Sequence, residues 1–167
     1  MYASIQQDSE RFVRSLNLPA VTGIRDLIPE VERRTGLAVE LQPAEVQVST
    51  PCGLWIATEK RHYIFYDPRT SVAHQDHIIA HEIAHILKDH QGTAKMSTDV
   101  SGISAELILS VLGRTQYDDA QELEAEMVGT YLQAHVLYHR KDRSGILDES
   151  ESGRVARTFI RSRKSNP

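Results

Sequence analysis

The chain has 167 residues, a length that predicts one domain able to bury roughly two-thirds of its unfolded surface. Hydrophobic residues make up 40% and charged residues 25% of it, as in an ordinary soluble globular protein, and no apolar run approaches the roughly 18 residues of a transmembrane helix. The formal net charge of −4 gives no global reason to bind nucleic acid, so we expect neither membrane nor direct nucleic-acid contact.

Two features predict a cytoplasmic location. The first residues, MYASIQQDSERFVRS, lack the basic-then-apolar order of a signal peptide. The single cysteine, Cys52, cannot form an internal disulfide, which fits a reducing compartment. We expect Cys52 to be a packing residue.

Hydrophobic periodicity predicts two helices at the start of the chain. Residues 4–17 carry a weak helical pattern that ends before Pro19. Residues 24–35 follow the i, i+3, i+4, i+7 spacing of apolar positions more closely. Gly36 is well placed to end this second helix.

Three strands follow the second helix. Residues 37–41 alternate apolar and polar side chains with the period of two that is typical of a strand. Residues 54–57 and 62–66 are rich in aromatic and branched side chains, and the polar turn 58–61 joins them. The turn-forming residues 67–70 end this predicted sheet.

The next predicted helix, which Ser71 can cap, contains the pattern H-E-x-x-H at residues 81–85. Residues four apart lie on one face of a helix, so His81 and His85 can present ring nitrogens to one ion. Zinc accepts such ligands at about 2.0–2.1 Å and keeps one position for water in a catalytic site. Glu82 lies about 100° around from His81, where a carboxylate can take a proton from that water.

The ordinary alternative is that these histidines are exposed or satisfied side chains without a ligand. Three histidines in one stripe, with Glu82 between two of them, favour a metal site instead. One ion cannot bind all three, because His77 and His85 are ~12 Å apart along the helix, and Glu82 favours the pair His81 and His85. His74 and His77 are expected to line a cleft or the surface. The apolar residues of the opposite face are Val72, Ile79, Ala80, Ile83, Ile86 and Leu87.

Beyond this helix the pattern is less regular. Residues 91–100 are polar and predict a loop, and residues 103–112 predict a short helix. Asp118 is a good N-cap for a further helix, with Gln121 at the capping-box position. This helix should run to about Tyr138.

The last part of the chain is expected to be peripheral. Residues 139–151 predict a polar linker, and residues 155–160 predict a short helix. Residues 154–167 carry five basic side chains and no acidic one, which is typical of a solvated terminal segment.

Two histidines do not complete a zinc site, so a third ligand is required. A metzincin continues as H-E-x-x-H-x-x-G-x-x-H, but here Lys88 and Gln91 stand at the glycine and third-histidine positions. His90 is one residue out of register. The metzincin arrangement is therefore excluded.

A glutamate from a later helix, as in gluzincins, is the other source of a third ligand. Glu122 and Glu126 share a helix face with Gly129, which lets a neighbouring helix come close, whereas Glu124 points roughly 160° away. We predict that Glu122 ligates and that Glu126 supports a ligand histidine. The reverse assignment, with Glu126 as the ligand, stays open. An acidic first turn that only complements the helix dipole is the alternative explanation.

The segments I-A-H-E-I-A-H-I-L at 79–87 and E-L-E-A-E-M-V at 122–128 resemble the ImmA/IrrE family of metallopeptidases. The resemblance extends over roughly residues 22–137, although Glu126 stands where the family usually has Asn or Asp. It implies a cytoplasmic gluzincin-type peptidase with one zinc per chain, bound by His81, His85 and Glu122, and with Glu82 as catalytic base. Its substrate would be a helix-turn-helix repressor of the Xre class, in a stress response or a mobile element.

The expected fold is α+β: a small zincin-like domain with a short three-stranded sheet, antiparallel or mixed, packed on a helical bundle that contains the H-E-x-x-H helix. One domain should span residues 1–167, with its core at 22–138 and a peripheral part at 139–167. A substrate peptide would add as a strand along the sheet edge near residues 54–66.

The tetrahedral oxygen formed during hydrolysis needs a hydrogen-bond donor. The side chains chemically able to act are Tyr131, His135 and Tyr138, and their spacing does not choose among them. The competing function is a non-cleaving zincin-fold module that senses a signal or binds a repressor. Such a module has no chemical need for the carboxylate of Glu82.

Overall fold

The structure is a computed structural model that describes residues 2–45, 53–90, 94–96 and 118–144. Several predicted features lie outside these ranges. They are Cys52, the helix over 103–112, and the part of the chain beyond residue 144 with its linker, short helix and basic tail.

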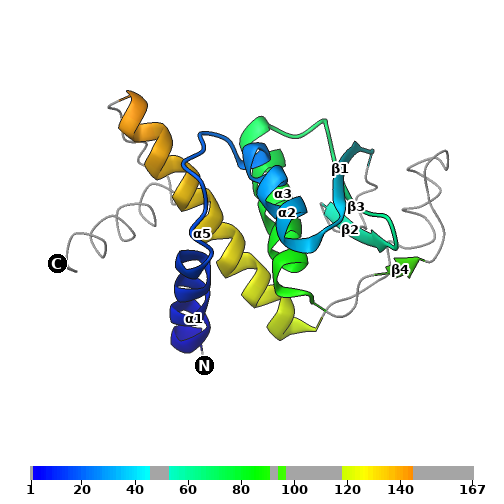
Figure 1. The fold of residues 1–167 in the computed structure, drawn as a ribbon, viewed down its shortest axis with the longest axis horizontal. Coiled ribbons are helices and arrows are strands. Elements are labelled where there is room, and N and C mark those ends of the chain that lie inside the picture. The colour runs from blue at the N-terminus through cyan, green and yellow to red at the C-terminus, as the bar shows by residue number, and fades with distance from the viewer. Residues whose placement is uncertain (1, 46–52, 91–93, 97–117, 145–167) are drawn as a thin grey trace.

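The described residues form helices and a small sheet, in the order that Figure 1 shows. The helices are α1 (Tyr2–Ser15), the 3-10 helix η1 (Ile24–Leu27), α2 (Ile28–Thr35), α3 (Val72–Lys88) and α5 (Asp119–Ser144). The strands are β1 (Ala38–Pro43), β2 (Gly53–Thr58), β3 (Arg61–Tyr66) and β4 (Ala94–Met96).

The sheet is mixed, with the strand order β1-β3-β2-β4. Strands β2 and β3 form the predicted antiparallel pair, while β1 runs parallel to β3 and β4 runs parallel to β2. The expected α+β fold with a mixed sheet is thus confirmed, but β4 is an additional strand within residues 91–100, which were predicted as a loop. Three residues are too few to show a period-two pattern, and only the pairing with Ile56–Thr58 of β2 defines this strand.

Two helix boundaries differ from the prediction. The helix predicted over residues 24–35 divides into η1 and α2, because Pro29 has no N–H to bond to the Arg25 carbonyl; the Ile28 N–H bonds to that carbonyl with 3-10 spacing instead. Helix α5 continues through residues that were predicted as linker and ends at Ser144. Arg140 and Lys141 are polar but good helix formers, so polarity alone does not end the helix.

Helix α3 lies between the sheet and α5, and α1 packs on the other side of α5 (Figure 1). The buried residues of α3 run from Ile78 to Ile86, including Glu82 and His85. The predicted apolar face packs into the core, but His81 and His85 on the opposite face are largely covered as well, by α5. Val72 was predicted to lie on the core face and is 70% exposed, because it precedes the buried part of the helix.

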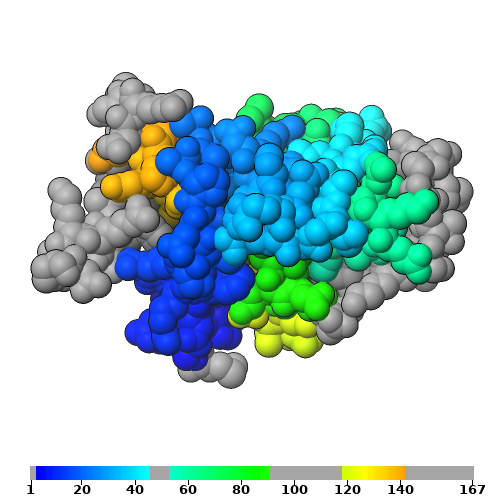
Figure 2. Space-filling view, in the orientation of Figure 1, coloured from blue at the N-terminus to red at the C-terminus, as the bar shows by residue number. Residues whose placement is uncertain are grey.

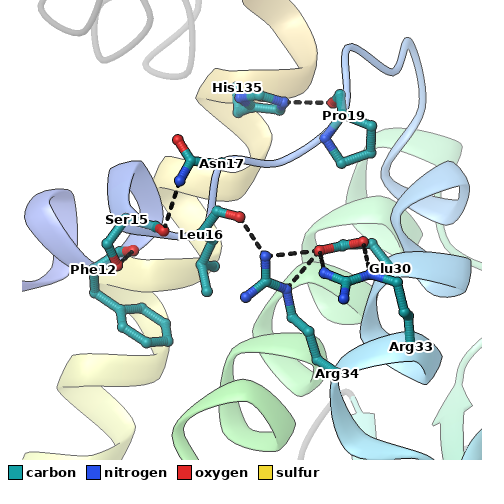
Figure 3. Close-up of polar contacts among 9 residues, drawn as sticks. All are labelled: Phe12, Ser15, Leu16, Asn17, Pro19, Glu30, Arg33, Arg34 and His135. Atoms are coloured by element: carbon teal, nitrogen blue, oxygen red, sulfur yellow. Dashed lines mark hydrogen bonds and ion pairs between the residues drawn. The ribbon is translucent and has the colours of Figure 1, made fainter.

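The segment between α1 and α2 is held by polar contacts to its carbonyl groups (Figure 3). The guanidinium of Arg34 in α2 donates to the Leu16 carbonyl and also binds Glu30. The His135 ring of α5 donates through Nε2 to the Pro19 carbonyl at 2.8 Å. The first contact holds the end of α1 to α2, and the second holds the connection to α5.

The space-filling view looks onto α1 and α2, with the end of α3 and the start of α5 emerging below them (Figure 2). Among the residues that the structure describes, none of the helices combines the length and the apolar character needed to cross a membrane.

Candidate metal centre

Contacts at the two ends of α3 fix where this helix begins and ends, and so position the H-E-x-x-H segment within it. Ser71 caps the start, since its Oγ accepts a hydrogen bond of 3.2 Å from the His74 N–H, as predicted. At the other end Asp89 takes a left-handed conformation with φ of 48°. The chain therefore turns immediately after Lys88, and the His90 N–H bonds back to the His85 carbonyl at 3.1 Å.

Helix α5 brings the acidic residues to the histidines. The Asp118 carboxylate caps its start by accepting a hydrogen bond of 2.8 Å from the Gln121 N–H, as the sequence predicted. Eight residues after Gln121, Gly129 faces the backbone of α3: a Cβ added there would lie 3.2 Å from the backbone nitrogen of His81. The missing side chain thus permits the close helix approach that was expected of Gly129.

The three predicted ligand side chains meet between α3 and α5. The Nε2 atoms of His81 and His85 are 3.0 Å apart. Glu122 places Oε2 at 3.4 Å from Nε2 of His81 and Oε1 at 3.5 Å from Nε2 of His85. Around a tetrahedral ion with bonds of about 2.1 Å, ligand atoms lie about 3.4 Å apart. This cluster could therefore hold a metal ion.

The three side chains differ in their exposure to solvent. The His85 side chain is fully buried and that of His81 is 19% exposed, whereas that of Glu122 is 47% exposed. The histidines thus form a covered back wall, and the site opens to solvent on the Glu122 side. An additional ligand from solvent could enter there.

Glu126 lies on the other edge of the His81 ring. Its Oε2 is 3.5 Å from His81 Nδ1 and 3.4 Å from His77 Nε2. An ion at Nε2 of His81 and His85 is therefore reached by Glu122 and not by Glu126. The geometry favours the predicted roles, with Glu126 supporting His81 from behind.

The surroundings act differently on the two histidines. Burial, together with the nearby His81 and His90, lowers the pKa of His85 to about 3. Burial also acts to lower the pKa of His81, but the hydrogen bond to Glu126 and the charges of Glu82 and Glu122 outweigh it and raise that pKa. His85 is consequently neutral at pH 7, the form in which imidazole binds a metal.

Glu82 points toward the sheet, where it is 5% exposed. Burial, together with the charge of Glu122, raises its pKa to about 7, although His81 and a hydrogen bond from the Trp55 backbone act in the opposite direction. Its Oε2 has no hydrogen-bond partner among the described residues. The carboxyl group fits only because β2 starts with a glycine, since a Cβ at Gly53 would lie 2.7 Å from Glu82 Oε1.

Sequence reasoning missed two side chains that contact the site from behind. His90, which was considered only as a metzincin ligand and excluded, is 5% exposed and lies 2.9 Å from His85, with Nδ1 facing Nδ1. Its Nε2 is 3.0 Å from Oε2 of Glu124, a residue that was placed away from the site. A histidine immediately before the predicted loop at 91–100 was the available signal.

The three candidate donors for the tetrahedral oxygen face away from the cluster. The Tyr131 hydroxyl interacts with Gln6 of α1, and burial raises its pKa. His135 binds the Pro19 carbonyl. Tyr138 lies two turns beyond Tyr131 and hence on the same side of α5. The sequence assigned this role to none of the three, and these positions favour none of them.

The expected substrate position is also corrected. Strand β3 lies between β1 and β2, and β2 is paired with β4 at Ile56–Thr58. The sheet edge predicted near residues 54–66 is therefore largely occupied within the chain. In that stretch, only residues 53–55 of β2 have no strand partner on the side away from β3, within the part of the chain that the structure describes.

Comparison of the chain with models of protein families, with curated proteins and with solved structures found no match.

Proposed function

We propose that this protein is a zinc-dependent peptidase that hydrolyses a peptide bond with an activated water. The observation that carries the proposal is the meeting of His81, His85 and Glu122, whose ligand atoms are 3.0–3.5 Å apart. Two imidazole nitrogens and one carboxylate oxygen form the ligand set of many catalytic zinc sites. Structural zinc sites usually have four protein ligands, and this trio leaves one position for solvent.

Each residue has a distinct role in the proposed reaction. Bound zinc would supply a Lewis acid that polarises the scissile carbonyl and lowers the pKa of a water to near 7. Glu82 would accept the proton of the attacking water and pass it to the leaving amine. Without an ion, burial raises the pKa of this carboxyl group to about 7; the positive charge of a bound ion would lower it and favour the ionised form that accepts the proton.

The substrate class rests on the resemblance to the ImmA/IrrE family. It suggests a helix-turn-helix repressor of the Xre class, cleaved in the cytoplasm during a stress response or by a mobile element. The exposed Glu122 side of the cluster supports access by another protein, since the histidines are covered and Glu122 is half-exposed.

The test is metal content per chain after reconstitution with zinc, in the wild type and in matched alanine variants. We expect about one zinc in the wild type and none in His85→Ala or Glu122→Ala. Glu126→Ala, four residues away on the same helix, should still bind zinc, with about 10–100-fold lower affinity because it loses only the support of His81.

Cleavage is then measured with zinc-loaded protein on a peptide library, read by mass spectrometry. Glu82→Gln should keep the zinc and lose cleavage, because the amide cannot accept the proton of water. A wild type without zinc would refute the metal site. A wild type that binds zinc but cuts nothing, also with repressor proteins as substrates, would favour the non-cleaving module that binds a repressor.

A further inference from the structure

His90 occupies a buried position immediately behind the candidate metal centre. It follows the left-handed Asp89 at the end of α3, and this turn directs its ring back toward His85. The His90 ring is nearly perpendicular to the His85 ring, at an interplanar angle of 75°. Its Nδ1 lies 2.9 Å from Nδ1 of His85, the ring nitrogen that faces away from Glu122.

The far side of His90 is bound by a carboxylate. Oε2 of Glu124 is 3.0 Å from His90 Nε2, and Oε1 of the same group is 2.7 Å from the Lys88 ammonium. An ionised carboxylate only accepts hydrogen bonds, and the adjacent ammonium favours that ionised form. His90 must therefore donate its Nε2–H to Glu124.

This first bond fixes the direction of the second. A neutral imidazole carries one N–H, so a His90 ring protonated at Nε2 presents an acceptor at Nδ1. The contact of 2.9 Å then requires His85 to donate its own Nδ1–H. The proton of His85 is thereby held at Nδ1, and its Nε2 lone pair faces His81 and Glu122.

We propose that His90 and Glu124 are positioning residues that hold His85 in the tautomer and orientation needed to bind a metal ion through Nε2. This inference rests on the proposed metal site. With the opposite tautomer, Nε2 of His85 would carry a hydrogen and could not ligate. Because the His85 side chain is fully buried, no water from bulk solvent replaces the lost hydrogen bond.

We call the hydrogen-bonded series His85–His90–Glu124 the relay. With it, both candidate ligand histidines are connected to a carboxylate, by different routes. Glu126 reaches Nδ1 of His81 directly, at 3.5 Å. Glu124 reaches Nδ1 of His85 through the ring of His90. Loss of a group that orients a ligand histidine lowers metal affinity by about 10–100-fold, and His90→Phe should have an effect of this size.

The experiment measures zinc affinity by competition with a chelator, and the visible spectrum of the cobalt(II)-substituted protein. His90→Phe keeps a buried ring and removes both hydrogen bonds, whereas His90→Gln retains one acceptor and one donor. The matched control is His135→Phe, because His135 is equally buried, at 4% against 5% exposure, and bonds to the Pro19 carbonyl instead. Glu124→Leu interrupts the relay at its far end, where the side chain is 29% exposed, without a substitution in the core.

We expect about 10–100-fold weaker zinc binding and an altered cobalt spectrum for His90→Phe and Glu124→Leu. His90→Gln should recover most of the affinity, and His135→Phe should match the wild type. A wild type that binds zinc, with unchanged affinity in Glu124→Leu and in folded His90→Phe, would overturn the relay and leave the metal site standing. A wild type that binds no zinc would overturn the metal site and the relay together.

Discussion

The contact between Gly129 and α3 allows a quantitative test of how the site is assembled. In Gly129→Ala, the new methyl group would lie 3.2 Å from the backbone nitrogen of His81 and 3.3 Å from the carbonyl atoms of Ala80. These are backbone atoms of a helix whose other side packs into the core, where Ile79 and Ile83 are fully buried. Helix α3 therefore cannot move away freely, and the two helices must separate by a few tenths of an ångström.

Two opposing terms determine the stability of this variant. Alanine is favoured over glycine within a helix by about 1 kcal/mol. Overpacking of a tightly packed interior costs about 1–3 kcal/mol. The net result is a destabilisation on the order of 1 kcal/mol, which for a chain of this size lowers Tm by about 2–4 °C.

The same strain should weaken metal binding. An ion bound by His81 and His85 on one helix and Glu122 on the other pulls the helices together again. If zinc binding must bring the helices together against about 1 kcal/mol of strain, the zinc affinity falls about fivefold, since 1.4 kcal/mol corresponds to a factor of ten. The effect on affinity should appear although Gly129 touches none of the three ligand side chains.

The assay combines thermal unfolding of the metal-free chain with zinc competition. Thr130→Ala and Thr130→Gly serve as the reference pair, because the Thr130 hydroxyl bonds only within α5, to the Glu126 carbonyl at 2.8 Å. The difference between them measures the alanine–glycine preference at the next position. If Gly129→Ala is stabilised by that same amount and binds zinc normally, the close contact does not exist and this reasoning fails.

Two further predictions concern residues on either side of the site. Gly53→Ala would bring a Cβ within 2.7 Å of Oε1 of Glu82; cleavage should fall much more than zinc content, because Glu82 is displaced and no ligand is touched. Glu30 has its pKa lowered from 4.5 to about 2 by the hydrogen bond from Arg33 and, against the effect of burial, by Arg34. Ionised Glu30 contributes on the order of 1 kcal/mol to the free energy of unfolding. This contribution is complete above pH 4.5 and is lost as the pH falls through about 2. Acid unfolding should therefore show the stability difference between wild type and Glu30→Gln shrinking over that range; a constant difference would contradict it.

Much of the core of the fold could be predicted because its signals are local. The caps Ser71 and Asp118 and the stop at Gly36 each depend on a few neighbouring residues, and each lies where the sequence placed it. Strands β2 and β3 are short runs rich in aromatic and branched side chains, and a short turn joins them. The spacing of His81 and His85 on one helix likewise follows from helical geometry alone.

The features that sequence reasoning missed depend on contacts between distant segments. Strand β4 has three residues and is defined by its pairing with β2. The position of Tyr131 on the α1 side of α5 depends on which helices surround α5, which a single helical wheel does not show. His90 follows the end of α3, where helical periodicity no longer predicts direction and the left-handed Asp89 decides it.

The spacing of Glu122, Glu124 and Glu126 acquires a physical reason once both helices are considered. A helix dipole favours acidic residues in the first turn, which accounts for Glu122 but not for the two that follow. On a wheel, Glu124 points away from Glu122 and Glu126, yet the turn after α3 carries His90 around to meet it. Glu122 thus faces the Nε2 atoms of both histidines, Glu126 faces Nδ1 of His81, and Glu124 reaches Nδ1 of His85 through His90. Substitution of each glutamate should accordingly affect a different ring nitrogen, and only the loss of Glu122 removes an atom that could bind the ion.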